Sequence, residues 1–207
     1  MSSSTDLTAR ARIREAAIAL FAERGIGAAT IRDIADAAGV SSGLLRHHFG
    51  SKEGLRDACD DYVMAELARI RAPYLDGRGF GEQGLLDAIQ AAPLVLQTYM
   101  VRSTMDGSPT GTKMFERMVD EGERWLATAP LKSADPRAYA AVLVALKMGM
   151  YLLRDQISEA IGADTRTPAG QARMFRAAVE IFAQPMLSAD LADQAYAVLD
   201  RLISSQE

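Results

Sequence analysis

The chain has 207 residues, of which 49% are hydrophobic and 6% aromatic, and its formal net charge is −4 at pH 7. This apolar share excludes an unfolded chain, and the acidic balance argues against a protein coated in nucleic acid. Ala, Leu, Met, Arg and Glu, which lose least on entering a helix, are prominent, so we predict an all-α fold. The single Cys59 allows no internal disulfide, and we find no signal-like leader or long apolar run. We therefore expect a soluble cytoplasmic protein that does not enter a membrane.

Charge is unevenly distributed along the chain. Residues 1–56 hold eight Lys and Arg against six Asp and Glu, whereas residues 57–207 hold fifteen against twenty-one. A slightly basic end on an acidic body is typical of a protein that touches DNA with one end only.

Four helices are predicted in the N-terminal third. The first spans 7–24, with Ile13, Ala17, Leu20 and Phe21 on one face. Thr30 and Asp33 approximate a capping box for a short second helix that ends at Gly39. Ser41 caps a third helix, which ends at Gly50, and a fourth starts at Ser51 and holds helical spacing as far as Pro73.

The glycine-rich stretch 74–83 is the candidate break before a larger helical body. Helices are predicted over 85–105 with an interruption at Pro93, over 112–128, and over 137–161, the longest. A further helix, 168–184, is capped by Thr167, and the last opens at Ser188.

Two short helices that meet at a Gly-Val-Ser turn form the minimum unit for placing one helix in the major groove of DNA. Spacing alone does not distinguish this unit from helical hairpins that do not bind DNA. However, AAIALFAERGIGAATIRDIADAAGVSSGLLRHHFGSKEGL (Ala16 to Leu55) resembles the DNA-binding signature of the TetR family in residue type and spacing almost throughout. The resemblance implies a three-helix helix-turn-helix domain over 1–55. It also implies a ligand-binding and dimerisation domain over 56–207, entered through a connecting helix at 52–70.

The resemblance assigns the recognition helix to Ser41 through Phe49, with Ser42, Gly43, Leu44 and Arg46 facing base edges. An Arg guanidinium can bond guanine O6 and N7 together, although a phosphate contact by Arg46 stays open. Many relatives carry Tyr where Arg46 stands, so their contact there does not transfer.

Phosphate contacts are implied for Thr30, His47, His48 and Lys52. Arg32 is a candidate for an extra contact to a base or to the DNA backbone. Capping alone is an alternative for Thr30, and packing near Phe49 is an alternative for His48. The expected core of this unit is Leu20, Phe21, Ile34, Ala35, Val40, Leu45 and Phe49.

One helix-turn-helix reads few base pairs, so we expect a homodimer on a palindromic double-stranded operator. The resemblance implies that the helices near 137–161 and 168–184 form the dimer bundle. Packing of these stripes inside one subunit is the alternative.

An unidentified small-molecule effector is implied, and it would bind among the central helices. The candidate ligand residues are Tyr99, Met100, Arg102, Met118, Trp125, Lys147, Met148, Tyr151 and Arg154. Such apolar residues are more often plain core than ligand lining. Arg102, Lys147 and Arg154 need a partner, which could be Asp155, Glu121 or an anionic ligand.

The predicted function is a ligand-responsive transcriptional regulator, with repression the commoner family outcome. We expect effector binding to move the connecting helix and respace the two recognition helices. A ligand-binding or scaffold protein without operator binding is the alternative. An enzyme is disfavoured because Cys59 and His47 lack placed catalytic partners, and no cofactor or metal is expected.

Overall fold

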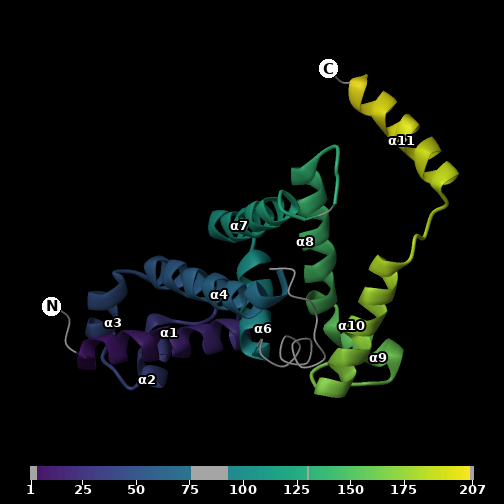
Figure 1. The fold of residues 1–207 in the computed structure, drawn as a ribbon. Coiled ribbons are helices and arrows are strands. Elements are labelled where there is room, and N and C mark those ends of the chain that lie inside the picture. The colour runs from purple at the N-terminus through teal and green to yellow at the C-terminus, as the bar shows by residue number, and fades with distance from the viewer. Residues whose placement is uncertain (1–3, 76–92, 130, 206–207) are drawn as a thin grey trace. The chain divides into compact units, whose positions relative to one another are not determined.

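The computed structural model describes residues 4–75, 93–129 and 131–205, and every regular element in these ranges is a helix (Figure 1). The prediction of an all-α fold is confirmed for this part of the chain. The predicted helix before Pro93 and the stretch 76–83 lie outside the described residues. The helices are α1 Ser4–Arg24, α2 Ile31–Ala38, α3 Ser42–Phe49, α4 Lys52–Leu75, α6 Leu94–Thr104, α7 Pro109–Leu126, α8 Pro136–Leu152, α9 Arg154–Ile161, α10 Pro168–Ala183 and α11 Ala189–Ser204.

Helix starts follow the capping residues in the sequence. The predicted N-caps Thr30, Ser41, Thr167 and Ser188 are confirmed, and each side chain accepts a hydrogen bond from a backbone N–H three residues later. These bonds satisfy donors that no helical carbonyl reaches.

The prediction that 137–161 forms one helix, the longest of the chain, is wrong. This region forms α8 and α9, which meet at Leu153 with a bend of 66°. Arg154, the first residue of α9, is buried, and its guanidinium donates a hydrogen bond to the Gln97 side chain on α6. Apolar spacing continues through the break, so periodicity could not reveal it.

Helix α4 continues past Pro73 to Leu75, two residues beyond the predicted end. Proline removes one backbone donor, and this loss falls in the last turn of the helix. At 24 residues, α4 is longer than either α8 or α9.

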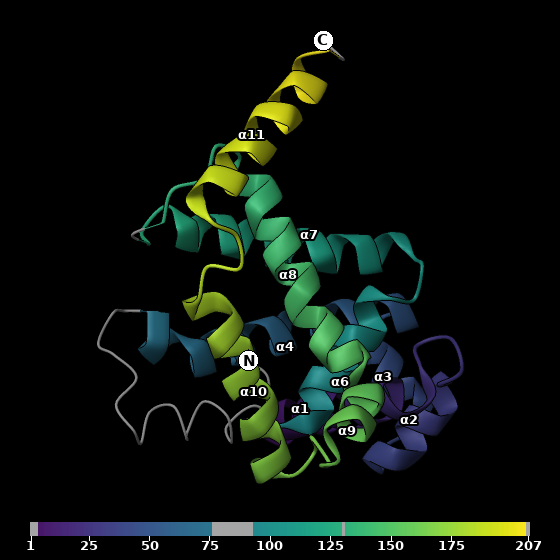
Figure 2. The ribbon, with the colours of Figure 1, turned by 90° about the vertical axis from the view of Figure 1, so that its right-hand side faces the viewer.

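The chain divides into two compact units, residues 1–156 and 157–207. In the first unit α1 packs against α2, α4 and α6, and α8 crosses α7 (Figure 2). One apolar core runs from Ile13 on α1 to Met148 on α8, and it includes every predicted core residue except the half-buried Val40, which packs against it. The predicted domain boundary between residues 55 and 56 stays a prediction.

In the second unit, the segment between α9 and α10 is held by polar contacts. The Ser158 and Thr165 hydroxyl oxygens lie 2.9 Å apart, and Arg173 donates to the Ile161 carbonyl at 2.7 Å.

Over the described ranges, no helix taken singly has the length and apolarity to cross a membrane. The bent pair α8 and α9 meets these criteria only when its two helices are counted together.

Candidate DNA-binding surface

The turn between α2 and α3 depends on Gly39. Its φ of +64° lies in the left-handed region, and Gly39 N–H donates to the Asp36 carbonyl at 3.2 Å. Val40 N–H donates to the Ala35 carbonyl at 3.0 Å, which closes the end of α2. The Ser41 hydroxyl then accepts from Leu44 N–H at 3.1 Å and caps α3, so that three residues separate the end of α2 from the start of α3.

Helix α3 has a buried face and a solvent face. Leu45 and Phe49 point into the core. The predicted contact residues lie elsewhere on the helix: Ser41, Gly43, Arg46 and His47 are exposed, and Ser42, Leu44 and His48 are half-buried. Three basic residues therefore gather in the last turn of α3, and two of them are exposed.

Thr30 is exposed and already serves as a cap. Its hydroxyl accepts from Asp33 N–H at 3.1 Å and donates to Asp33 Oδ2 at 2.7 Å, so the predicted capping box is confirmed. Hydrogen bonds from the Thr30 side chain and backbone hold the pKa of Asp33 below its usual value. A phosphate contact by Thr30 would be added to this role.

Lys52 and Arg32 lie beside this surface. Lys52 Nζ donates to the Gly27 carbonyl at 3.2 Å and so ties the start of α4 to the segment before α2. The Arg32 side chain is 88% exposed and lies 4.0 Å from Asp36, a spacing that holds it weakly.

The ring of His48 lies close to the rings of the residues before and after it in the sequence. Its ring centroid is 5.6 Å from that of His47 and 6.2 Å from that of Phe49. This geometry agrees with the alternative in which His48 packs near Phe49.

The predicted ligand residues fall into three groups. Tyr99, Met100, Met118 and Met148 are buried in the core, Trp125 and Tyr151 are half-buried, and Arg102 and Lys147 are exposed. Arg154 is buried, bonded to Gln97, with its guanidinium carbon 5.4 Å from the Tyr151 ring centroid. Gln97 differs from the partners that the sequence suggested for Arg154, which were Asp155, Glu121 or an anionic ligand.

A buried polar network that sequence reasoning missed joins α4 to the end of α6 and the start of α7. Arg56 contacts Asp106 at 2.7 Å and donates to the Ser108 hydroxyl and the Ser103 carbonyl, each at 2.8 Å. The Asp60 carboxylate accepts from the Tyr99 and Ser103 hydroxyls at 2.7 and 2.8 Å. Arg56 and Asp60 occupy the same face as Leu55, Cys59 and Val63, and charges within an apolar stripe were the available signal.

Burial and pairing shift the pKa values of the two acidic groups in this network. Desolvation raises the pKa of Asp60, although bonds from Tyr99 and Ser103 and the charge of Arg56 oppose the rise. Partial burial also acts on Asp106, but there the bonds from Ser108 and Arg56 outweigh it and lower the pKa.

Comparison with known proteins decides the family. The model "Bacterial regulatory proteins, tetR family" matches residues 13–59, and the model "Tetracyclin repressor-like, C-terminal domain" matches residues 90–188. The transcriptional regulatory protein RaaS of Mycobacterium tuberculosis is 41% identical over 165 residues, which cover 75% of this chain and 76% of that protein. The chain belongs to the TetR family.

Other TetR-family proteins match parts or most of the chain. The transcriptional repressor KstR2 of Rhodococcus jostii is 58% identical over 74 residues, covering 33% of this chain and 36% of that protein. A solved structure titled γ-butyrolactone receptor superposes with a TM-score of 0.54 at 26% identity, over 72% of this chain and 81% of that one.

Membership of the TetR family makes the chain a helix-turn-helix transcriptional regulator and not an enzyme. TetR-family regulators bind DNA operators and small-molecule ligands.

Proposed function

We propose that this TetR-family chain is a repressor that binds a palindromic operator as a homodimer and leaves it when a small molecule binds the body. The observation that carries the proposal is the division of α3. Leu45 and Phe49 anchor the helix, while Arg46 and His47 are exposed and free to meet a groove. The name of KstR2 as a repressor favours repression over activation.

Arg46 is the proposed base contact, together with Ser42, Gly43 and Leu44. Thr30, Arg32, Ser41, His47, His48 and Lys52 are proposed to position the helix on phosphates. Because Lys52 is already bonded to the Gly27 carbonyl, a phosphate contact would use the remaining donors of its ammonium group.

Selection of duplexes from a random pool with the purified protein tests this function. A palindrome is expected, with half-sites about 34 to 36 Å apart or a multiple of that distance. Protein that retains no duplex at low ionic strength would contradict DNA binding and leave a ligand-binding or scaffold role.

Two variants separate base from phosphate contacts. Arg46→Ala should lower the binding free energy that discriminates one base position by about 1 to 3 kcal/mol and so relax the base preference there. Lys52→Ala should weaken binding to all duplexes alike and lower the slope of log affinity against log salt concentration by about 1. Lys113→Ala, at an exposed lysine of α7, is the charge-matched control and should change neither quantity. Uniform loss on all sequences for Arg46→Ala would make Arg46 a phosphate contact.

The effector site is proposed among Tyr99, Met100, Met118, Trp125, Met148 and Tyr151, with Arg102, Lys147 and Arg154 as its charged members. Helix α4 offers a route to the DNA-binding unit, because its first residue contacts Gly27 while Arg56 and Asp60 bind the α6–α7 region. Because one similar solved structure is titled a γ-butyrolactone receptor, γ-butyrolactones are the first probes to test.

Release is tested by titrating such a lactone into the protein–operator complex. A ligand shifts this equilibrium only by its difference in affinity for the two states. A compound that raises the melting temperature but leaves operator affinity unchanged would contradict the switch and leave DNA binding intact.

A further inference from the structure

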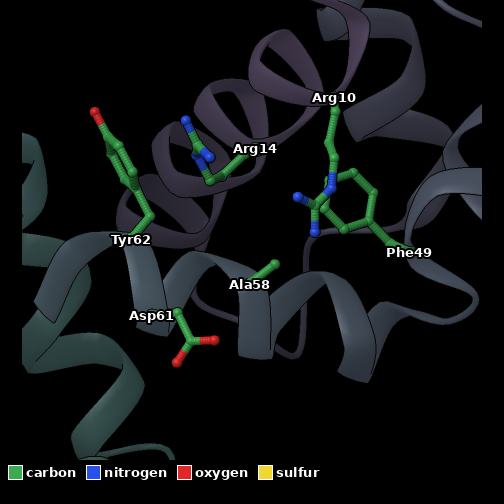
Figure 3. Close-up of a pocket in the computed structure, with 6 residues that line it drawn as sticks. All are labelled: Arg10, Arg14, Phe49, Ala58, Asp61 and Tyr62. Atoms are coloured by element: carbon green, nitrogen blue, oxygen red, sulfur yellow. The ribbon is translucent and has the colours of Figure 1, made fainter. Parts of the chain in front are cut away.

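A pocket of about 290 Å³ lies between α1 and α4 in the first unit. It is lined by Arg10, Arg14, Phe49, Ala58, Asp61 and Tyr62 (Figure 3). None of the residues proposed to contact DNA or effector is among them, although Phe49 also anchors helix α3.

Two guanidinium groups face this pocket, each held against an aromatic ring. Arg10 and Arg14 are one helical turn apart on α1, so they share a face. The guanidinium carbon of Arg14 lies 3.9 Å from the Tyr62 ring centroid, and that of Arg10 lies 5.2 Å from the Phe49 centroid. Stacking on a ring orients the guanidinium plane and leaves its N–H edges available to an acceptor.

These edges have no acceptor within the described part of the chain. Neither arginine forms an ion pair there, and Arg14 Nε is buried with no hydrogen-bond partner. A buried donor without a partner is costly and rare in folded proteins. The carboxylate at the edge, Asp61, turns away from both arginines (Figure 3) and bonds Arg117 at 2.9 Å.

We propose that this pocket binds a small organic carboxylate. The carboxylate would accept from the guanidinium N–H groups of Arg10 and Arg14 that face the pocket, in the charge-assisted geometry that arginine prefers. Phe49, Ala58 and Tyr62 would contact the apolar part of an organic ligand. Inorganic phosphate has no apolar part, so these contacts favour an organic carboxylate over phosphate. The volume suits a ligand of about one ring, near the lower end of ordinary ligand sites. The proposal does not depend on the effector site proposed above.

Binding is tested on the full chain with benzoate as the probe and benzamide as its neutral counterpart. Arginine Nε–H resonances are followed by NMR, and affinity is measured by calorimetry. We expect benzoate to shift the Arg14 Nε–H resonance saturably and benzamide to leave it unchanged. Arg14→Gln should weaken benzoate by about tenfold or more, as for a lost hydrogen bond to a charged group. Arg12→Gln, at the exposed arginine between the two, is the matched control and should bind normally.

A second pair of variants covers the case in which Arg14→Gln does not fold. Arg10→Gln should weaken benzoate binding. Arg14→Lys should also weaken it, because lysine keeps the charge but lacks the planar pair of donors. Equal affinity for benzoate and benzamide, equal loss in Arg12→Gln, or phosphate binding as tight as benzoate would overturn the proposal. Failure of benzoate to bind, with weakened duplex binding by Arg14→Gln, would assign these arginines to DNA and also overturn it.

Discussion

A single backbone angle sets the turn that presents α3. Gly39 closes α2 at φ +64°, and a Cβ built there meets no atom within 4 Å. Any penalty for a side chain at this position is therefore conformational and not steric crowding from neighbours.

Gly39→Ala should lower the free energy of unfolding by about 1 kcal/mol, because alanine is disfavoured in the left-handed region. Chemical denaturation measures the change. Gly27→Ala is the matched control: its position has open space and no positive φ, so little change is expected. Equal losses in the two variants would show that the left-handed angle is not the cause.

Helix α4 is held to the body through charge as well as apolar contact. Arg56 and Asp60 are both nearly inaccessible, at 6% and 3% exposure, whereas the neighbouring pair Arg117 and Asp61 is open to solvent. Removing one member of a buried pair strands the other in a poorly solvated place, which an exposed pair does not do.

Arg56→Met should cost about 3 to 5 kcal/mol of stability at neutral pH, because Asp60 and Asp106 lose their shared cation. Arg117→Met, which breaks the exposed pair, should cost less than about 1 kcal/mol. Denaturant unfolding of both variants measures the difference, and similar costs would contradict the assigned role of burial.

The cost of Arg56→Met should also depend on pH. The folded-state pKa of Asp60 is raised by burial, and loss of Arg56 raises it further. A raised folded pKa favours the folded state at low pH, and this benefit is lost as pH rises through that pKa. The penalty should therefore shrink on acidification and be largest at neutral pH. A penalty that grows as pH falls would contradict this sign.

The whole molecule exposes many large apolar side chains. Val142 and Leu146 on α8 are 60% and 57% exposed, and Val179 and Phe182 on α10 are 59% and 64% exposed. They lie in the two regions predicted to form the dimer bundle. Large exposed apolar surface of this kind marks interaction sites.

We predict that the purified chain is a dimer and that Phe182→Asp shifts it toward monomer, because the interface would bury an unpaired charge. Sedimentation velocity over a concentration series measures the shift, with an expected weakening of about tenfold or more. Met105→Asp, at a 60% exposed methionine outside both helices, should leave the dimer unchanged. A monomeric parent protein would contradict the prediction directly.

Much of the N-terminal unit follows from the sequence because its determinants are local. The caps at Thr30 and Ser41, the glycine at 39 and the buried faces around Leu45 each depend on residues within about one helical turn. Such signals predict which side of α3 is buried and which side is left exposed to solvent.

The tertiary structure decided what depends on residues far apart in the chain. The break before Arg154 accompanies its bond to Gln97, 57 positions away, and Arg56 meets Ser108 across 52 positions. The same holds for Arg14 on α1 and Tyr62 on α4, which meet only after folding. Sequence patterns record that a charge stands in an apolar stripe, but its partner is chosen by packing, because only packing brings distant side chains within bonding distance.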